Sequence, residues 1–180
     1  QLIEEIVTPT KTEPGREKRE GYHYKRNGAC VVLMAIEPLT GKRIVDVTMQ
    51  KTKVDYSNFM KKVSATYPSA KKIVLLQDNL NTHNPSFYQN MPAQEAFELT
   101  NRFDMKYTPK RASWLNMAEI EFSALSKQCL DRRMGEFSKL KSEVIQWTKQ
   151  RDDAKIKIHW QFTNAKAREK FKRHCDSITN

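Results

Sequence analysis

The feature that most constrains the fold is an aliphatic run that ends on an acidic residue. Four of the five residues in 73–77 (IVLLQ) are aliphatic, and this pattern predicts a strand that is buried on both faces. The run ends on Asp78, so the strand would deliver a carboxylate to the C-terminal edge of a sheet. Open α/β folds bind their ligands at that edge. The run therefore predicts an α/β fold with a candidate site at Asp78.

Polar side chains follow Asp78 directly in the sequence. Asn79 and His83 belong to a polar cluster just past the strand, and such clusters are typical of functional sites. Asp78 alone could equally cap the following turn, because Asp and Asn favour helix starts and tight turns. Asn79, His83 and Asn116 are candidates for orienting the substrate or for hydrogen-bonding to a metal-binding carboxylate. His83 could instead be an exposed loop histidine.

A second acidic residue lies near the start of a predicted helix that follows Ser113. The apolar stripe of this helix consists of Leu115, Ala118, Phe122, Leu125 and Cys129. Glu119 and Glu121 are two positions apart, so they point to different helix faces. Glu119 could be a surface residue favoured by the helix dipole, or a cation ligand facing Asp78, as phosphodiester chemistry requires. Before the helix, Asn116 is expected to cap it and Trp114 to pack in the core.

The rest of the pattern predicts alternating strands and helices. Two apolar runs, 29–37 and 43–49, flank Pro-Leu-Thr-Gly and predict a hairpin. The other predicted elements are a helix over 55–66, a helical stretch over 85–102 interrupted near Pro92, a strand over 103–107, a helix marked by Phe137, Leu140, Val144 and Trp147, a short strand over 156–160 and a basic helix over 165–174. This order predicts a mixed α/β fold.

The formal net charge of +11 favours association with polyanions, and nucleic acid is a better candidate than an acidic membrane surface. Four basic stretches, KRNG, MKYTPKR, LDRRM and KAREKFKRH, could neutralise backbone phosphates, although any one of them could be a solvated face. The candidate DNA contacts are Lys25, Arg26, Lys106, Lys110, Arg111, Arg132 and Arg133. No apolar run approaches the roughly 18–20 residues of a membrane span, and no signal peptide is visible. The cysteines lack CxxC spacing, which suits a reducing cytoplasm and argues against structural zinc.

Two segments of the chain resemble a known family. KIVLLQDNLNTHNP followed by MKYTPKRASWLNMAEIEFSALSKQCLDRR resembles the DDE endonuclease domain of bacterial insertion-sequence transposases, and more closely the insertion sequence 630 branch of the Tc/mariner superfamily. The segment YKRNGACVVLMAIEPLTGKR is similar to the first half of that domain. The signatures D-N-x-x-x-H and S-W-L-N-x-x-E carry the resemblance together. It runs from about Ile6 to the C-terminal helix.

The resemblance implies an RNase H-like mixed sheet flanked by helices, and three acidic residues that hold two Mg²⁺ or Mn²⁺ ions. It assigns Asp78 as the second acid and Glu119 as the third. The family's first aspartate has no counterpart in the chain, because Asp46 lies in the predicted hairpin and Asp55 at a predicted helix start. We therefore expect the domain to lack its first, central strand. The chain opens at Gln1 in polar sequence and is expected to be an interior piece of a longer protein.

Together these patterns predict three segments: an extended basic arm over 1–28, an RNase H-like catalytic domain over 29–151 and a basic helical extension over 152–180. The arm could contact phosphates or be a solvated connector. The predicted function is DNA strand cleavage and strand transfer by a transposase in the bacterial cytoplasm, acting on double-stranded transposon ends and target DNA, with the isolated piece inactive. The alternatives are a non-catalytic DNA-binding remnant and an RNase H-like nuclease. Transposases of this kind usually act as dimers, although the sequence contains no interface signal.

Overall fold

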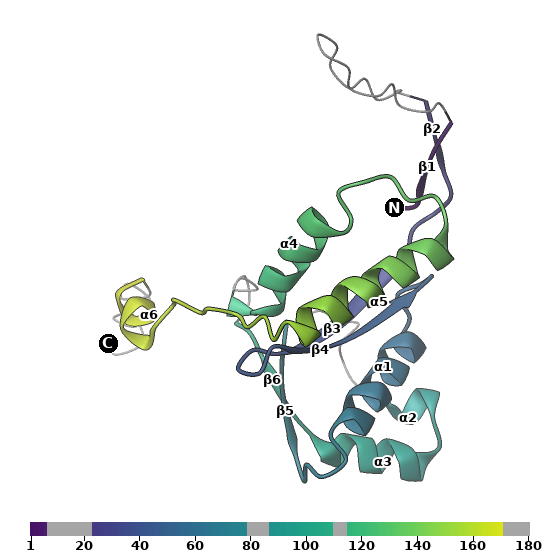
Figure 1. Ribbon diagram of the computed structural model, residues 1–180. Helices are drawn as coiled ribbons and strands as arrows, with labels where there is room; N and C mark the ends of the chain where they lie inside the picture. Colours follow the sequence, from purple (N-terminus) through teal and green to yellow (C-terminus); the bar gives the residue numbers. More distant parts are fainter. Residues whose placement is uncertain (7–22, 79–86, 110–114, 171–180) are drawn as a thin grey trace.

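The structure is a computed structural model that describes residues 1–6, 23–78, 87–109 and 115–170. Its strands are β1 (Ile3–Glu5), β2 (Tyr24–Arg26), β3 (Val31–Glu37), β4 (Lys42–Thr48), β5 (Ile73–Gln77) and β6 (Phe103–Tyr107). Its helices are α1 (Lys53–Thr66), α2 (Phe87–Asn90), α3 (Ala93–Arg102), α4 (Ala118–Gln128), α5 (Phe137–Asp153) and α6 (Asn164–Lys170). This order confirms the mixed α/β class (Figure 1).

The described strands form three separate pairs. β3 and β4 make the predicted antiparallel hairpin, with Val31 opposite Thr48. β5 and β6 are parallel, with Ile73 opposite Phe103, and the short strands β1 and β2 are antiparallel. Within the described ranges no ladder joins β3 to β5, so the sheet is present only as short pieces. Short sheets with helices on both sides are consistent with an RNase H-like domain.

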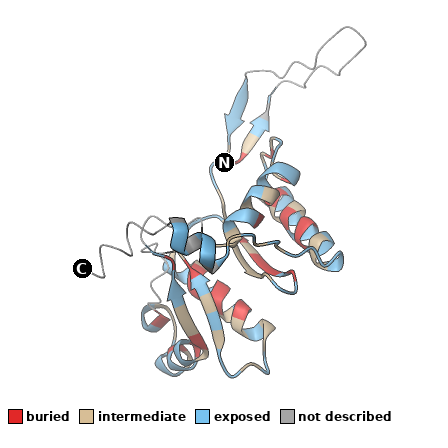
Figure 2. Cartoon of the chain, turned by 90° about the vertical axis from the view of Figure 1, so that its left-hand side faces the viewer, coloured by how far each residue is buried: buried red, intermediate tan, exposed pale blue. Residues whose placement is uncertain are grey.

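Strand β4 separates two apolar cores because its side chains alternate between the two faces of the hairpin. Val45 and Val47 pack in the core with residues of α4 and α5, whereas Ile44 packs with residues of α1, α2 and α3. Figure 1 shows these two sets of helices on either side of the hairpin. The first core also contains Leu2, Leu125, Cys129, Met134, Leu140, Val144 and Trp147. The second also contains Tyr56, Phe59, Met60, Val63, Phe87, Ala96, Leu99 and Phe103. Buried residues consequently line the inner sides of the elements (Figure 2).

Two expectations about strands need correction. β5 is not buried on both faces, because Val74 is 67 % exposed and Leu76 is 46 % exposed. Helices α4 and α5 pack against β3 and β4 and leave that side of β5 open to solvent. The second correction concerns residues 156–160, which form no strand. Their largely exposed segment follows α5 after a short turn at residues 154–155 and leads to α6.

Helix boundaries follow the local signals in the sequence. Thr52 and Asp55 form a reciprocal capping box at the start of α1. Pro92 separates α2 from α3, as expected for a residue that has no N–H and a fixed φ. The predicted helices after Ser113 and around Val144 correspond to α4 and α5. No helix of the described part is both long enough and apolar enough to cross a membrane.

A polar network of four charged side chains lies beside the first core. Arg43 on β4 is fully buried, and its Nε donates to Glu121 Oε2 on α4 over 2.7 Å. Arg151 on α5 donates from Nε to the same oxygen over 3.2 Å and from Nη2 to Oε1 over 3.0 Å. Asp152 accepts from Arg43 Nη1 over 3.1 Å. Two cations and two anions therefore neutralise one another, and we call this set the Arg43–Glu121 network.

The turn of the hairpin is built into this network. Gly41 has φ +80°, and a Cβ placed there would lie 2.5 Å from the carbonyl oxygen of Ile156. Arg43 donates from Nη1 to the Gly41 carbonyl and from Nη2 to the Ile156 carbonyl, the latter over 2.9 Å. Only glycine fits this turn without strain, because of both the positive φ and the close approach.

The surroundings of Glu121 set its charge state. Burial raises the pKa of its carboxyl, but the hydrogen bonds and charges of Arg43 and Arg151 outweigh burial, so that the pKa is lowered below its ordinary value. Glu121 is therefore ionised at neutral pH. Removing it would leave two guanidinium groups facing each other in a site that excludes water.

We predict that Glu121→Ala lowers the free energy of unfolding by about 3–5 kcal/mol, because it leaves buried charge without compensation. The matched control is Glu143→Ala, which breaks the more exposed pair with Arg132 and should lower it by less than about 1 kcal/mol. Urea denaturation followed by circular dichroism measures both values. Equal losses in the two variants would contradict the assigned role of the network.

Candidate active site

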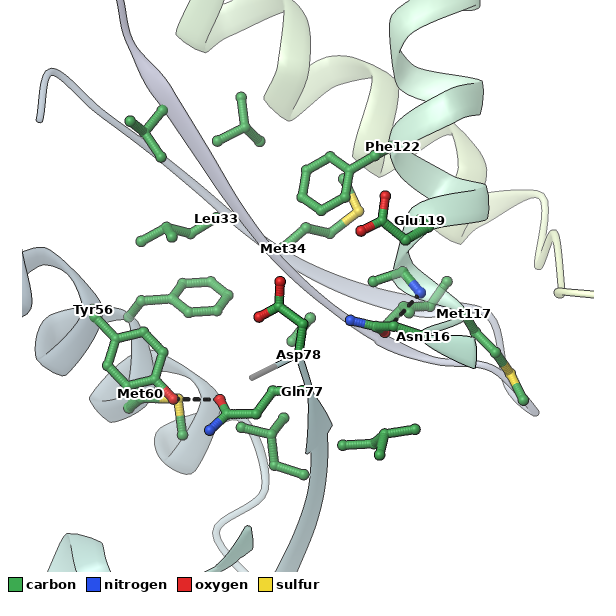
Figure 3. A pocket seen from close by; sticks show the side chains of 18 of the residues that line it. Leu33, Met34, Tyr56, Met60, Gln77, Asp78, Asn116, Met117, Glu119 and Phe122 are labelled. Atoms are coloured by element: carbon green, nitrogen blue, oxygen red, sulfur yellow. Dashed lines mark hydrogen bonds between the residues drawn. The ribbon is translucent and has the colours of Figure 1, made fainter. Parts of the chain in front are cut away.

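A pocket of about 390 Å³ lies between the β3–β4 pair and the β5–β6 pair. Strand β3 lines one side of it and β5 the other, with residues 31–36 and 74–77 respectively. Helix α1 contributes Tyr56, Phe59 and Met60, and the start of α4 contributes residues 116–119 together with Phe122 (Figure 3). The pocket therefore lies where four elements meet.

The pocket is lined by strand edges. Successive side chains of a strand point to opposite faces, so a pocket that borders only one face is lined by every second residue. Here consecutive residues of β3 and of β5 line the pocket, which indicates that their backbone edges face it. In the described part, the ladder of β3 is made with β4 and that of β5 with β6. The opposite edges of β3 and β5 are the ones that border the pocket.

Both predicted acids line this pocket. Asp78 follows the last residue of β5 directly, and Glu119 is the second residue of α4. Figure 3 shows the two carboxylates entering the pocket from two sides, with Met34 of β3 beside them. Asp78 is half-buried and its Oδ1 is shielded from solvent, whereas Glu119 is exposed. Folding thus brings two acids that are distant in sequence to one cavity.

The N-cap residue of α4 is Met117, which makes no side-chain cap hydrogen bond, so the expectation that Asn116 is the cap is wrong by one position. Asn116 nevertheless holds the first turn of α4. Its side-chain Oδ1 accepts a hydrogen bond from the Ala118 N–H over 3.1 Å, and its carbonyl oxygen accepts one from the Glu119 N–H over 3.1 Å. These bonds satisfy amide groups that a helix start leaves without partners inside the helix. Asn116 also lines the pocket, with its side-chain nitrogen on the pocket side (Figure 3). Asn116 therefore both hydrogen-bonds to the first turn of α4 and lines the pocket.

A neutral polar pair lies next to Asp78. Tyr56 on α1 donates its hydroxyl to Gln77 Oε1 over 2.7 Å, and both residues are buried. Burial raises the pKa of Tyr56 strongly, and the charge of Asp78 adds to the increase. The hydroxyl therefore stays protonated and remains a donor at every physiological pH. The pair fixes the residue that precedes Asp78.

The structure distinguishes the two glutamates of α4. Glu119 faces the pocket, whereas Glu121 is 99 % buried in the Arg43–Glu121 network on another face of the helix. The expectation that the two residues serve different surroundings is therefore confirmed. Of the two residues, Glu121 is the buried one.

Neither internal candidate for a further acid reaches the pocket. Asp46 lies on β4, where its Oδ1 accepts from the Val47 N–H over 2.9 Å and lies 3.7 Å from Lys141 Nζ. Asp55 is used in the capping box of α1. Neither residue lines the pocket.

The two pocket acids could supply two of the oxygen ligands that a divalent cation needs. Mg²⁺ and Mn²⁺ prefer oxygen ligands, and Asp78 and Glu119 offer carboxylate oxygens in one cavity. Within the described ranges no group of three or more His, Cys, Asp or Glu side chains is placed to hold a metal ion. The described residues therefore fit such an ion with two ligands, and further ligands would have to come from elsewhere.

Several predicted residues lie outside the described ranges. They are Asn79, His83, Lys110, Arg111 and Trp114. Their proposed roles stay predictions.

The other candidate DNA contacts are distributed over three places. Lys25 and Arg26 are exposed on β2, and Arg132 and Arg133 lie between α4 and α5. The fold brings two of them together, since the guanidinium carbons of Arg26 and Arg133 each lie 5.7 Å from the centre of the Tyr24 ring. Arg132 pairs with Glu143. The Nζ atom of Lys106 on β6 lies 3.1 Å from Asp104 Oδ1.

The sequence reasoning missed the polar partners around the site. Arg43 starts the predicted strand over 43–49 and Arg151 lies in a polar helix end, so neither spacing nor periodicity connects them with Glu121. The one available signal was an arginine at the start of a predicted hairpin strand, because a charge that becomes buried is normally paired.

Comparison with known proteins yields one match. The family model described as DDE superfamily endonuclease matches residues 3–141. No curated protein and no solved structure matches the chain significantly. The matched range contains both pocket acids and the strands that border the pocket.

We predict that Asn116→Ala destabilises the protein by about 1 kcal/mol, because the first turn of α4 loses a capping acceptor. Asn116→Ser keeps a side-chain oxygen at the cap and should retain most of the stability. Chemical denaturation measures both. A loss as large for serine as for alanine would show that capping is not what Asn116 contributes.

Proposed function

The chain belongs to the family of DDE superfamily endonucleases, and from this premise we propose that it is the catalytic part of a DNA transposase that cleaves and joins DNA strands with divalent metal ions. The family implies a transposase-type nuclease function, a DNA substrate and the use of divalent metal. The observation that supports the assignment in this chain is the meeting of Asp78 and Glu119 in one pocket. The insertion sequence 630 resemblance narrows the proposal to that branch.

In this proposal Asp78 and Glu119 hold Mg²⁺ or Mn²⁺ through their carboxylates. When bound, such ions activate water or a 3′-hydroxyl as nucleophile and stabilise the leaving oxygen of an in-line displacement at phosphorus. Asn116 keeps the first turn of α4 in place and Gln77, held by Tyr56, does the same for the end of β5. The chain's own contribution is thus to hold two acids from separate elements at one place.

Basic side chains would hold the DNA by its phosphates and leave sequence reading to other parts of the protein. Exposed candidates are Lys25, Arg26, Lys106 and Arg132, and Arg133 is half-buried beside Tyr24. They belong to a chain with net charge +11, whose association with DNA would weaken steeply as the salt concentration rises.

We further propose that the pocket receives an extended strand of the same protein from outside residues 1–180. The edges of β3 and β5 that border the pocket offer N–H and C=O groups on both sides. One strand inserted there would pair with both edges and unite β4, β3, β5 and β6 into a single mixed sheet. The resemblance to RNase H-like domains supports a central strand at this place.

The inserted strand would also complete the acidic site. Its alternate side chains would face α4, where Glu119 lies, and a carboxylate at the height of Asp78 would be the third ligand. This agrees with the two acids found in the pocket. It also explains why Asp46 and Asp55 have other roles.

For the complete transposase we predict that Asp78→Ala and Glu119→Ala each reduce Mg²⁺-dependent nicking of transposon-end DNA by about 100-fold or more, since each removes a ligand for ions that supply several kcal/mol of charge stabilisation. Nicking of a supercoiled plasmid that carries the transposon ends measures the effect. Glu95→Ala is the control, because Glu95 pairs with Lys61 on the surface.

Full activity in either acid variant would rule out the assignment. Cleavage of an RNA–DNA hybrid in preference to duplex DNA would favour the RNase H-like nuclease. DNA binding that is salt-sensitive but independent of metal, without any cleavage, would favour the non-catalytic remnant.

We predict that hydrogen exchange distinguishes the 180-residue chain from the complete transposase. In the complete protein, the amides of β3 and β5 that do not pair with β4 or β6 should exchange at least about tenfold more slowly, because a new ladder protects them. The amides of β4 that pair with β3 serve as the internal control and should be protected in both proteins. Equal exchange at the pocket edges would exclude the inserted strand, as would metal-dependent DNA cleavage by the 180-residue chain alone.

A further inference from the structure

We propose that the Arg43–Glu121 network is a positioning device that sets the rotation of α4 and so directs Glu119 into the pocket. This inference rests on the proposed function of Glu119 as a metal ligand. Arg43, Glu121 and Arg151 touch neither the pocket nor any reacting group, so they act through Glu119.

Glu121 is held from two directions. Arg43 reaches it from β4 over 2.7 Å, and Arg151 reaches both of its oxygens from α5 over 3.2 and 3.0 Å. The carboxylate plane is thereby fixed between two planar guanidinium groups, whose donors have a set geometry. A helix held at one residue from two sides cannot turn about its axis without breaking these bonds.

The two arginines are themselves immobilised. Arg43 is anchored by the carbonyl groups of Gly41 and Ile156 and by Asp152. Arg151 lies over the Trp147 ring, with its guanidinium carbon 5.0 Å from the ring centre, and its Nη1 donates to Gln128 Oε1 over 3.2 Å. The frame that holds Glu121 therefore includes the hairpin turn and the end of α5.

Apolar packing does not replace this frame at the start of α4. The buried apolar residues at this helix, Leu125 and Cys129, lie toward or just past its C-terminal end. In the first turn Ala118 is half-buried, Glu119 is exposed and Ile120 is 43 % exposed, which leaves Glu121 as the one fully buried residue of that turn. Phe122, the next residue, packs against the first core but is only half-buried. Apolar contact is also non-directional, whereas charged hydrogen bonds fix an orientation. Buried ion pairs have such a role in some other proteins.

The spacing on the helix makes the coupling direct. Two residues correspond to a rotation of about 200° about the axis, so the side that holds Glu121 lies nearly opposite the side that carries Glu119. With Glu121 held between β4 and α5, Glu119 faces the pocket beside Asp78 (Figure 3). A turn of α4 by a few tens of degrees would carry Glu119 out of the pocket.

The test measures the orientation of α4 without metal or DNA. Nitroxide labels are attached to Ala65→Cys on α1 and Ser126→Cys on α4, both exposed, in the 180-residue chain with its native cysteines replaced by alanine. Double electron–electron resonance should give one narrow distance distribution. Glu121→Gln should broaden or shift it, because one carboxylate oxygen becomes an NH₂ group that meets a guanidinium donor.

Two further variants complete this experiment. Glu143→Gln makes the same chemical change in the pair with Arg132 and should leave the distribution unchanged. Arg151→Gln removes one of the two holders of Glu121 and should also broaden the distribution, so the test stands even where Glu121→Gln does not fold. An unchanged distribution in a folded Glu121→Gln or Arg151→Gln protein would overturn the proposal.

A second measurement separates this proposal from the proposed function. In the complete transposase, Glu121→Gln should raise the Mn²⁺ concentration that gives half-maximal nicking by about tenfold, as is typical when support of a metal ligand is lost. Glu119→Gln should abolish nicking and leave the label distances unchanged. Nicking that survives Glu119→Gln would refute only the metal role of Glu119. Unchanged label distances in Glu121→Gln would refute only the positioning role of the network.

Discussion

The need of every buried peptide group for a hydrogen-bond partner relates the candidate site of this protein to the pairing of its strands. β3 and β5 each pair on one side within the described ranges, and the other edge of each borders the same pocket. Asp78 stands at the end of one such edge, and Glu119 arrives from the helix that covers the other. The pocket, the two acids and the strand edges that border the pocket are therefore one feature of the described fold.

The rest of the molecule supports this arrangement from two sides. The alternation of β4 gives each of the two cores its own set of helices, so that α1 and α4 approach the pocket from opposite faces of the hairpin. The charged network then adds direction to packing that is otherwise non-directional. Apolar packing thus sets the position of the helices around the pocket, and charged hydrogen bonds set the orientation of α4.

Much of the fold could be predicted from sequence because local patterns determine it. The hairpin followed from two apolar runs around a turn, and β6 matches its predicted range of 103–107. The prediction that β5 is buried on both faces was wrong. The pattern of the sequence shows that Val74 and Leu76 are apolar, but it does not show whether a helix covers them. The strand expected at 156–160 failed for a similar reason, since an alternating stretch needs a neighbouring strand to pair with.

The site was accessible from sequence only in part. Asp78 and Glu119 were found because a strand end and a helix start are readable, and the structure places both on one pocket. Periodicity could separate Glu119 from Glu121 but could not say which of them would be buried. That choice depends on Arg43 and Arg151, whose proximity is a tertiary fact. The roles of Asn79 and His83 stay predictions.

The open side of β5 has a practical consequence for handling the protein. Val74 and Leu76 present an apolar surface directly beside a strand edge, and such combinations are templates for edge-to-edge aggregation between molecules. The net charge of +11 opposes this association by mutual repulsion, and salt weakens that repulsion. Solubility should therefore fall as ionic strength rises, so that the conditions that strip bound DNA during purification are also those that favour precipitation.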